Sequence, residues 1–334
     1  MKIFKYDIDL NSYYPEYLNK NISFAFLDIE TDGFNSVKNN IVLIGLYIVT
    51  EESSNIIQLF SDRGRDDERK ILTEFTKIIK NIDFIYTYNG ATFDIPFLSK
   101  KFKYYNIYNP IDDIAHIDLI KIIRSNKKVL RLDNCKLKTV ENYIGISRED
   151  SISGKDSVLL YKKYLKNKSP AIEKTILKHN YDDIFYLSKV LEFEDNLRDK
   201  YNNSMILGID NDEYDNLNFF EIISIRANDS NIVLKGNVLN RLKEHNIYGN
   251  SYNLNIDSKN KNFELIIFTE NCQIGSDRIA KFIDLNSDNL LDYNIIKYKD
   301  DCNAKIPDNL LLLEFNQEIL VDNIKNLLRN ILKR

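Results

Sequence analysis

Hydrophobic and polar positions follow two different periods along the first part of the chain. The segments 22–30, 41–49 and 56–60 are continuous or alternating apolar runs separated by polar turns, which predicts three strands in an antiparallel meander. In residues 68–80, apolar side chains recur at spacings of three and four, which is typical of an amphipathic helix. The chain therefore begins with strands and continues into a helix.

Beyond residue 84 the pattern becomes mainly helical. It predicts one more strand over 84–88 and helices over 93–102, 117–123, 136–143, 157–165 and 171–194. Gly145, Gly154 and Pro170 mark the breaks between helices. This order of elements predicts an α/β domain whose mixed sheet is flanked by helices.

The composition changes near residue 195. Residues 192–215 contain eight acidic and two basic side chains and include short Asn-rich stretches. We expect a first domain over 1–195, an acidic linker over 196–218 and a smaller C-terminal α+β module over 219–334, whose role no motif indicates. In this module the pattern predicts strands over 220–225, 231–238, 263–269 and 310–315 and helices over 238–245 and 321–332.

Composition limits the class of protein. With 43% hydrophobic and 29% charged residues in a chain of 334, a soluble globular protein of two domains is expected. The longest apolar run, Ile41–Val49, is too short to span a membrane, and charged residues interrupt the N-terminal ten positions, so we predict a cytoplasmic protein. Cysteines 135, 272 and 302 lack the spacing of a zinc site, which favours free, buried thiols.

Five side chains in three segments are candidates for chemistry. Asp28 and Glu30 lie two apart on the first predicted strand, so they share one face and can share one cation. Asp94 follows an Asn-Gly turn among apolar residues, and His179 lies four residues before Asp183, on one face of a helix. A solvated strand end, a helix N-terminal carboxylate and an ordinary helical pair are the structural alternatives.

Together the three segments resemble the exonuclease motifs of the DEDD nucleases in the ribonuclease-H-like superfamily, and the YprB-like family most closely. The matching motifs are Asp28–Thr31, Asn89–Asp94 and His179–Asp183, and the further matching stretches are His116–Leu119, Leu137–Glu141 and Arg148–Gly154. The resemblance covers residues 20 to 195 and implies a ribonuclease-H-like fold.

The resemblance also implies roles for individual residues. Asp28, Glu30, Asp94 and Asp183 would hold two Mg²⁺ or Mn²⁺ ions, since hard cations prefer oxygen ligands. His179 would take a proton from the attacking water. The histidine subclass has its His one position earlier, where this chain has Lys178, so His179 occupies the position of the tyrosine subclass. Asp183 is preferred to Asp182 as the ligand because an aliphatic residue follows it.

Charge distribution indicates a nucleic-acid partner more clearly than net charge does. The net charge is -4, yet residues 100–178 hold 18 basic and 9 acidic side chains. We expect Lys127, Lys128 and Arg131 to contact phosphates, Asn89 to orient the substrate, and Phe93 to stack on an unpaired base. A solvated helical face and core packing are the alternatives for the cations and for Phe93.

We therefore predict an enzyme, a metal-dependent nuclease that hydrolyses phosphodiester bonds. By resemblance it acts as a 3′-to-5′ exonuclease on single-stranded ends of DNA or RNA. The alternatives are a nucleic-acid-binding or scaffold protein that retains the fold without turnover, and a structure-specific endonuclease or ribonuclease.

Overall fold

The chain divides into two compact units, Met1–Asn202 and Asn203–Arg334. The computed structural model describes residues 1–8, 15, 22–50, 52–148, 152–197, 205–211, 216–240, 242, 245–274, 278–288, 290 and 307–332. The first unit has one sheet and the second has two, and each unit has its own hydrophobic core.

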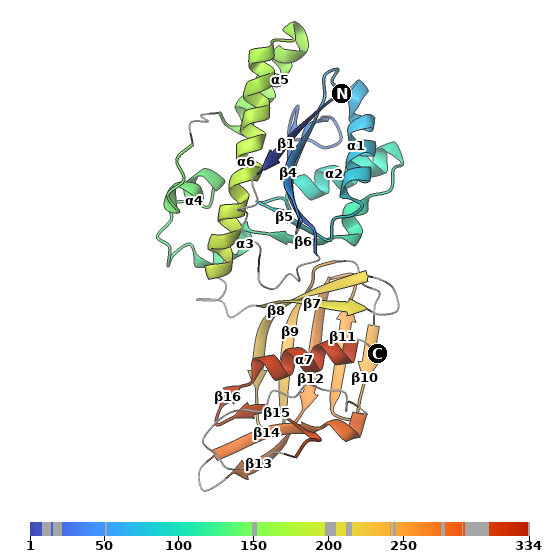
Figure 1. Cartoon of the computed structure of the whole chain (residues 1–334), viewed down its shortest axis with the longest axis vertical. Coiled ribbons are helices and arrows are strands. Elements are labelled where there is room, and N and C mark those ends of the chain that lie inside the picture. Colours follow the sequence, from blue (N-terminus) through green and yellow to red (C-terminus); the bar gives the residue numbers. More distant parts are fainter. Residues whose placement is uncertain are drawn as a thin grey trace. The chain divides into compact units, whose positions relative to one another are not determined.

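The first unit is built on a mixed sheet of six strands in the order β1-β4-β3-β2-β5-β6 (Figure 1). The strands are β1 (Lys2–Ile8), β2 (Phe24–Thr31), β3 (Ile41–Val49), β4 (Ser54–Phe60), β5 (Phe84–Thr87) and β6 (Ala115–Asp118). β2, β3 and β4 pair antiparallel, whereas β5 and β6 continue the sheet in parallel pairs beyond β2. The predicted meander and mixed sheet are confirmed.

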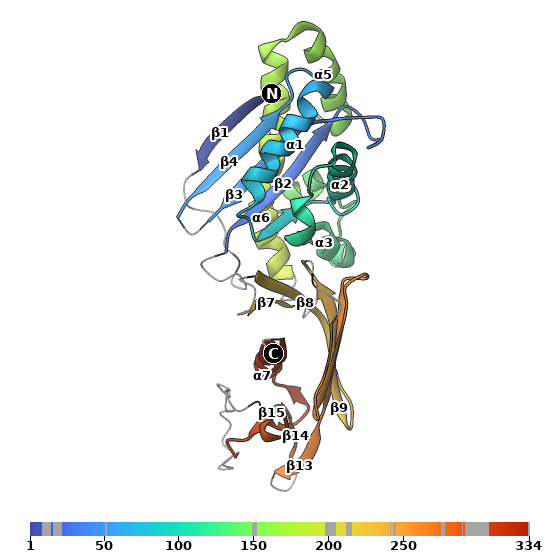
Figure 2. The same cartoon turned by 90° about the vertical axis from the view of Figure 1, so that its right-hand side faces the viewer.

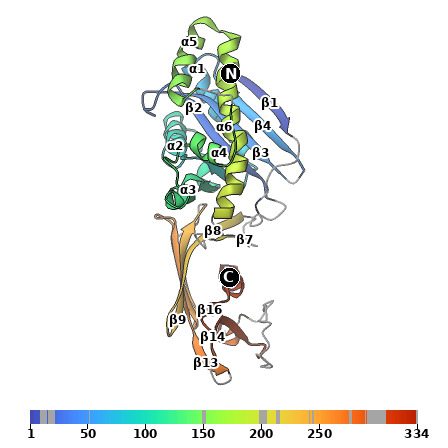
Figure 3. The ribbon, with the colours of Figure 1, turned by 90° about the vertical axis from the view of Figure 1, so that its left-hand side faces the viewer.

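Helices cover both faces of this sheet, so β3 is buried along its whole length. The helices are α1 (Arg65–Ile79), α2 (Asp94–Tyr105), α3 (Ile120–Asn126), α4 (Leu137–Tyr143), α5 (Gly154–Asn167) and α6 (Pro170–Leu197), with a short 3₁₀ helix η1 (Pro110–Asp113). Figures 2 and 3 view the unit from opposite sides and show α1 and α2 on one face and α4, α5 and α6 on the other.

Side chains of β2 alternate between these two faces, as the period of a strand requires. Leu27 and Ile29 join the core formed with α1 and α2. Phe26 points the other way and stacks on Tyr47, whose ring stacks on Phe185 of α6. The even-numbered positions of β2 therefore face α6.

One predicted helix of this unit begins differently. A helix was expected over 117–123. Residues 115–118 instead pair with β5 as strand β6, and helix α3 begins only at Ile120. Edge strand β1 was not predicted, since its lysines and aspartates interrupt the apolar pattern. Cys135 and Cys272 are free as expected, but the prediction of burial is wrong: Cys135 is partly exposed and Cys272 exposed. Cys302 lies outside the described residues.

The second unit contains two antiparallel sheets and one helix. Its sheets run β10-β11-β12-β9-β8-β7 and β13-β14-β15-β16. Their strands are β7 (Met205–Asn211), β8 (Asn216–Ala227), β9 (Asn231–Val238), β10 (His245–Tyr248), β11 (Tyr252–Asp257), β12 (Asn262–Phe268), β13 (Glu270–Ile274), β14 (Arg278–Asp284), β15 (Leu310–Phe315) and β16 (Glu318–Ile319), with η3 (Leu285–Asp288) and α7 (Val321–Leu332). Ile324, Leu327, Leu328 and Ile331 of α7 are fully buried in the core between the sheets.

Two predictions for this region are wrong. Val238 ends β9 and His245 begins β10, so the helix expected over 238–245 is absent from the described part of that segment, which leaves out 241, 243 and 244. The expected linker over 196–218 contains strand β7, and its residues 198–204 and 212–215 lie outside the described ones. Across the described chain, no helix combines the length and apolar character needed to cross a membrane.

Candidate metal centre

Three side chains from β2 and α6 form a cluster with the donor atoms of a cation site. Ligand atoms of Glu30, His179 and Asp183 all lie within 4.8 Å of one another. His179 Nε2 is 3.5 Å from Glu30 Oε1 and 3.7 Å from Asp183 Oδ2. Glu30 and His179 are buried, whereas Asp183 is partly exposed, so the cluster is reached from the side of Asp183.

Asp28 and Asp94 lie beside this cluster. Asp28 is one side-chain period before Glu30 on β2, and its Oδ2 accepts a hydrogen bond of 2.8 Å from Asn180 Nδ2. Asp94 is buried in the first turn of α2, where its Oδ1 accepts a hydrogen bond of 3.0 Å from the amide of Ile29. The structure thus brings together Asp28, Glu30, Asp94, His179 and Asp183.

The carboxylates of this site are close together and shielded from water, so their charges repel one another strongly. Burial, followed by repulsion from Asp183, Asp94 and Glu30, raises the pKa of Asp28. Burial is also the main cause that raises the pKa of Glu30 to about 7 and that of Asp94 to about 7. Because buried carboxylates are costly without a counter-charge, the donor set fits a hard divalent cation.

Asn180 is a part of this centre that the sequence did not indicate. It is fully buried on α6, and its Oδ1 accepts a hydrogen bond of 2.7 Å from Gln58 Nε2 while its Nδ2 donates to Asp28. Asp28, Gly45 and Gln58 are opposite one another on β2, β3 and β4. A Cβ at Gly45 would lie 2.1 Å from Asn180 Oδ1. Glycine between the two polar residues therefore makes room for Asn180.

Arg148 is a second residue that the motifs did not single out for a role. Its guanidinium bridges Asp183 Oδ1 and Glu141 Oε1 and lies 5.2 Å from the centroid of the Tyr186 ring. The side chains of Arg148 and Glu141 are 3% and 1% exposed. Arg148 thus contacts one oxygen of Asp183, while the other lies towards His179. The next three positions of that motif, 149–151, lie outside the described residues.

Asp118 organises the loop that precedes Asp94. Its two carboxylate oxygens accept hydrogen bonds from the amides of Asn89 (2.6 Å) and Ala91 (3.0 Å). Asn89 has a φ of 63°, a left-handed conformation that Asn tolerates better than most residues. Its side-chain Oδ1 accepts a hydrogen bond of 2.9 Å from Arg124 Nη2. Asn89 therefore stabilises the conformation of this loop, independently of any contact with a substrate.

The other predicted substrate contacts are Phe93, which directly precedes Asp94, and three cations after α3. Phe93 is half-buried against the α1–α2 core, and its ring is 6.3 Å from that of Phe34, so packing accounts for much of its surface. Lys127, Lys128 and Arg131 are exposed on the connection from α3 to α4. Within the described part of the chain, no contact joins these three cations to the cluster.

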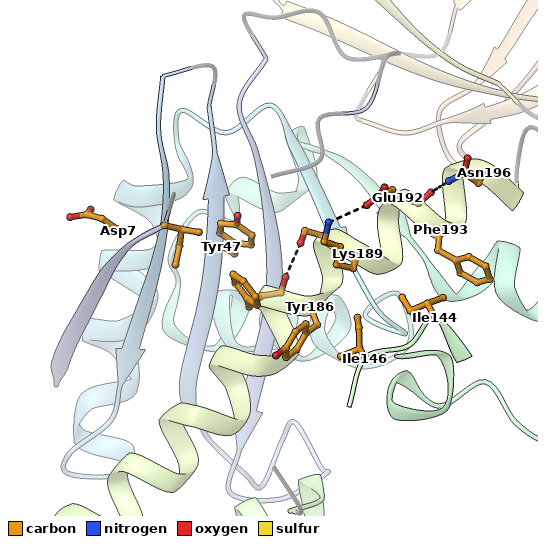
Figure 4. A pocket seen from close by; sticks show the side chains of 12 residues that line it. Asp7, Tyr47, Ile144, Ile146, Tyr186, Lys189, Glu192, Phe193 and Asn196 are labelled. Carbon is orange, nitrogen blue, oxygen red and sulfur yellow. Dashed lines mark hydrogen bonds and ion pairs between the residues drawn. The ribbon is translucent and has the colours of Figure 1, made fainter. Parts of the chain in front are cut away.

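A large cavity lies further along α6 and is separate from the cluster. It measures about 940 Å³ and lies between α6, the ends of β1 and β3, and the segment after α4 (Figure 4). Its described lining includes Tyr47, Phe185, Tyr186 and Phe193, with Lys189 joined to Glu192 at its polar side. None of the site residues predicted from the sequence is among these lining residues.

The fold and the site define a class of α/β proteins in which a mixed sheet presents a carboxylate cluster to a crossing helix. The RNase_H_2 model of the RNase H superfamily matches residues 25–194, just over half of the chain. The chain belongs to the RNase H superfamily. The match begins at β2 and ends in α6, so it includes every member of the cluster.

One curated relative agrees with this assignment. The uncharacterized protein YprB of Bacillus subtilis (strain 168) is 28% identical over 172 residues, which cover 51% of this chain and 41% of YprB. The chain therefore matches less than half of the length of that relative, and the expected YprB-like resemblance is confirmed.

Solved structures with similar folds are more distant. A family B DNA polymerase from Pyrobaculum calidifontis is 19% identical with a TM-score of 0.42, over 53% of this chain and 24% of the polymerase. Exonuclease I of E. coli in complex with an oligonucleotide is 13% identical with a TM-score of 0.34, over 64% of this chain and 55% of the exonuclease.

Proposed function

We propose that the first unit is a metal-dependent nuclease that hydrolyses phosphodiester bonds. The observation that carries this proposal is the convergence of four carboxylates and one imidazole from β2, α2 and α6, where burial, followed by nearby charges, raises the pKa of Asp28, Glu30 and Asp94. Membership of the RNase H superfamily supports it. The same support does not extend to the second unit, which lies outside the matched residues.

The residues that would hold two Mg²⁺ or Mn²⁺ ions are Asp28, Glu30, Asp94 and Asp183. Their donor atoms are all carboxylate oxygens, which these cations prefer. When bound, the ions would activate water and stabilise charge on the phosphate and on the departing oxygen.

The remaining residues hold groups in position or move a proton. His179 belongs to the cluster, where its Nε2 lies near Glu30 and Asp183, which suits it to accept a proton from the attacking water. Asn180 fixes the carboxylate of Asp28, and the amide of Ile29 fixes that of Asp94. Arg148 holds one oxygen of Asp183, which restricts the rotation of that carboxylate.

The finer proposal is a 3′-to-5′ exonuclease that removes nucleotides from single-stranded ends of DNA or RNA. It rests on the motif resemblance of the cluster residues. The test incubates the purified chain with Mg²⁺ or Mn²⁺ and end-labelled single-stranded and duplex DNA and RNA. Stepwise shortening from the 3′ end supports the proposal, and internal cuts would instead indicate an endonuclease.

Three matched variants sharpen this test. Asp28→Asn and Asp183→Asn remove a ligand charge and should abolish cleavage. Asp182→Asn is the control, because Asp182 adjoins Asp183 on α6 but pairs with Lys178 at 2.8 Å instead of facing the cluster. Equal loss in all three variants, or tight binding without cleavage under either metal, would contradict the proposal and favour a non-catalytic binding protein.

A further inference from the structure

A second pocket on the first unit is lined mainly by cations. It measures about 290 Å³ and lies between the β2–β3 loop, the start of α1 and the second half of α2. Its described lining holds five basic side chains and no acidic one: Lys38, Arg65, Lys100, Lys101 and Lys103, with Ser36, Val37, Asn40 and Tyr104. So dense a set of like charges favours an anionic ligand.

Only two of these five cations have a polar partner among the described residues. Lys101 is buried and pairs with Glu68 at 3.2 Å, and Arg65 donates a hydrogen bond of 2.5 Å to the Tyr104 hydroxyl. Lys38, Lys100 and Lys103 are exposed, and the described residues offer them no ion-pair partner. Three cations are therefore available to a bound anion.

The pocket is joined to the metal centre by one face of α2. Phe93, Pro96, Lys100 and Lys103 follow one another at spacings of three and four, so they form a stripe along the helix. Asp94 begins α2, and Lys103 is nine residues further, about 14 Å along the axis at ~1.5 Å per residue. A strand whose end reached the cluster would span this distance within a few nucleotides.

Exposed aromatic rings lie along the same path. Phe34 is 63% exposed and its ring is 6.3 Å from that of Phe93, while Tyr104 is 61% exposed at the pocket. Rings beside free lysines are the combination that binds unpaired bases together with their phosphates. Duplex ends would keep their bases paired and leave these rings without a stacking partner.

We propose that this basic pocket binds backbone phosphates of a single-stranded nucleic acid a few nucleotides away from the end held at the metal centre. The proposal rests on the proposed nuclease function for the direction of the strand, but not for the binding itself. It assigns phosphate contacts to Lys38, Lys100 and Lys103 and base stacking to Phe34. It is separate from the contacts expected of Lys127, Lys128 and Arg131 after α3.

The test measures binding without cleavage. Fluorescence anisotropy of labelled single-stranded DNA is followed in EDTA at several salt concentrations, for the intact chain and for the double variant Lys100→Gln/Lys103→Gln. Each phosphate contact on a single strand contributes about 0.7 to the slope of log affinity against log salt. The double variant should lower the slope by about 1.4 and the affinity at low salt about tenfold.

One control and one further variant separate this pocket from general charge. Lys162→Gln/Lys166→Gln removes two exposed lysines from α5, on the opposite face of the sheet, and should leave slope and affinity nearly unchanged. Phe34→Ala should weaken single-stranded binding about tenfold and duplex binding much less. Equal effects of the two lysine pairs, or equal loss for single strands and duplex, would overturn the inference.

Hydrolysis measured in parallel with Mg²⁺ distinguishes the two proposals. If cleavage occurs and the pocket variants bind as the intact chain does, the inference is wrong and the nuclease proposal stands. If no substrate is cleaved but the pocket variants lose binding as described, the inference stands and the nuclease proposal fails.

Discussion

Raising the pH should destabilise the first unit when no metal is bound. Burial and neighbouring carboxylates raise the pKa of Glu30 from 4.5 to about 7 and that of Asp94 from 3.8 to about 7. A carboxyl group with a higher pKa in the folded state contributes stability below its unfolded pKa and loses that contribution as the pH rises through the folded value. The loss should therefore fall between about pH 4 and about pH 7.

The size of the effect follows from Glu30. The difference between 4.5 and about 7, at about 1.4 kcal/mol for each pKa unit, corresponds to about 3 kcal/mol of unfolding free energy. Glu30 is only 7% exposed, so solvent screens this repulsion weakly. The contribution of Asp94 arises partly from the same repulsion and is not added.

The assay is chemical denaturation in the presence of a chelator, followed by helical circular dichroism, because helices α1 to α6 belong to the first unit. Between about pH 4 and about pH 8, the intact chain should lose about 3 kcal/mol more stability than Glu30→Gln, which cannot ionise. Glu192→Gln, at a side chain that is 43% exposed, is the matched control and should behave as the intact chain does. An identical pH dependence of the intact chain and Glu30→Gln would show that ionisation of Glu30 does not destabilise the folded unit.

Three further substitutions test the supports of the cluster. Gly45→Ala places a Cβ 2.1 Å from Asn180 Oδ1, so it should lower the free energy of unfolding by about 1–3 kcal/mol in chemical denaturation and weaken Mn²⁺ binding in calorimetry. Unchanged values for both would show that the contact at Gly45 is unimportant. Arg148→Met leaves two carboxylates without their cation and should destabilise the metal-free unit by roughly 3 kcal/mol. In thermal denaturation Mg²⁺ should then stabilise Arg148→Met more than the intact chain, and an equal gain speaks against this role. Asp118→Asn removes the charge that accepts the amides of Asn89 and Ala91, and hydrogen exchange at these amides should be faster by about tenfold, whereas unchanged protection would argue against it.

Much of the first unit was predictable because its signals are local. The strands that form the meander carry continuous or alternating apolar runs, and the period of two in a strand sufficed to put Asp28 and Glu30 on one face. The i,i+4 spacing of His179 and Asp183 did the same on α6. These short-range rules hold because backbone geometry alone decides the direction of such side chains.

Contacts between distant segments were not predictable in the same way. Asn180 contacts Asp28 only because the pairing of β2, β3 and β4 aligns Asp28, Gly45 and Gln58. That strand register cannot be deduced from the sequence of this chain alone. Arg148 reaches Asp183 across the space between α4 and α6. Both residues look like ordinary polar positions until the sheet and the helices are assembled.

The second unit was predicted less well for a related reason. Strand β11 alternates buried and more exposed side chains as a half-buried strand should, but asparagines occupy its outward positions and lower its strand propensity. Strands β13 and β16 are short edges of their sheet. Their place in the unit depends on pairing with neighbours and not on their own sequence.

The most direct test of the proposed metal centre is a crystal of the chain grown or soaked with Mn²⁺ and examined by anomalous scattering. We expect manganese density between the carboxylates of Asp28, Glu30, Asp94 and Asp183, and loss of that density in Asp28→Asn. Manganese bound only at other acidic side chains, with these four carboxylates unchanged and without an ion, would contradict it.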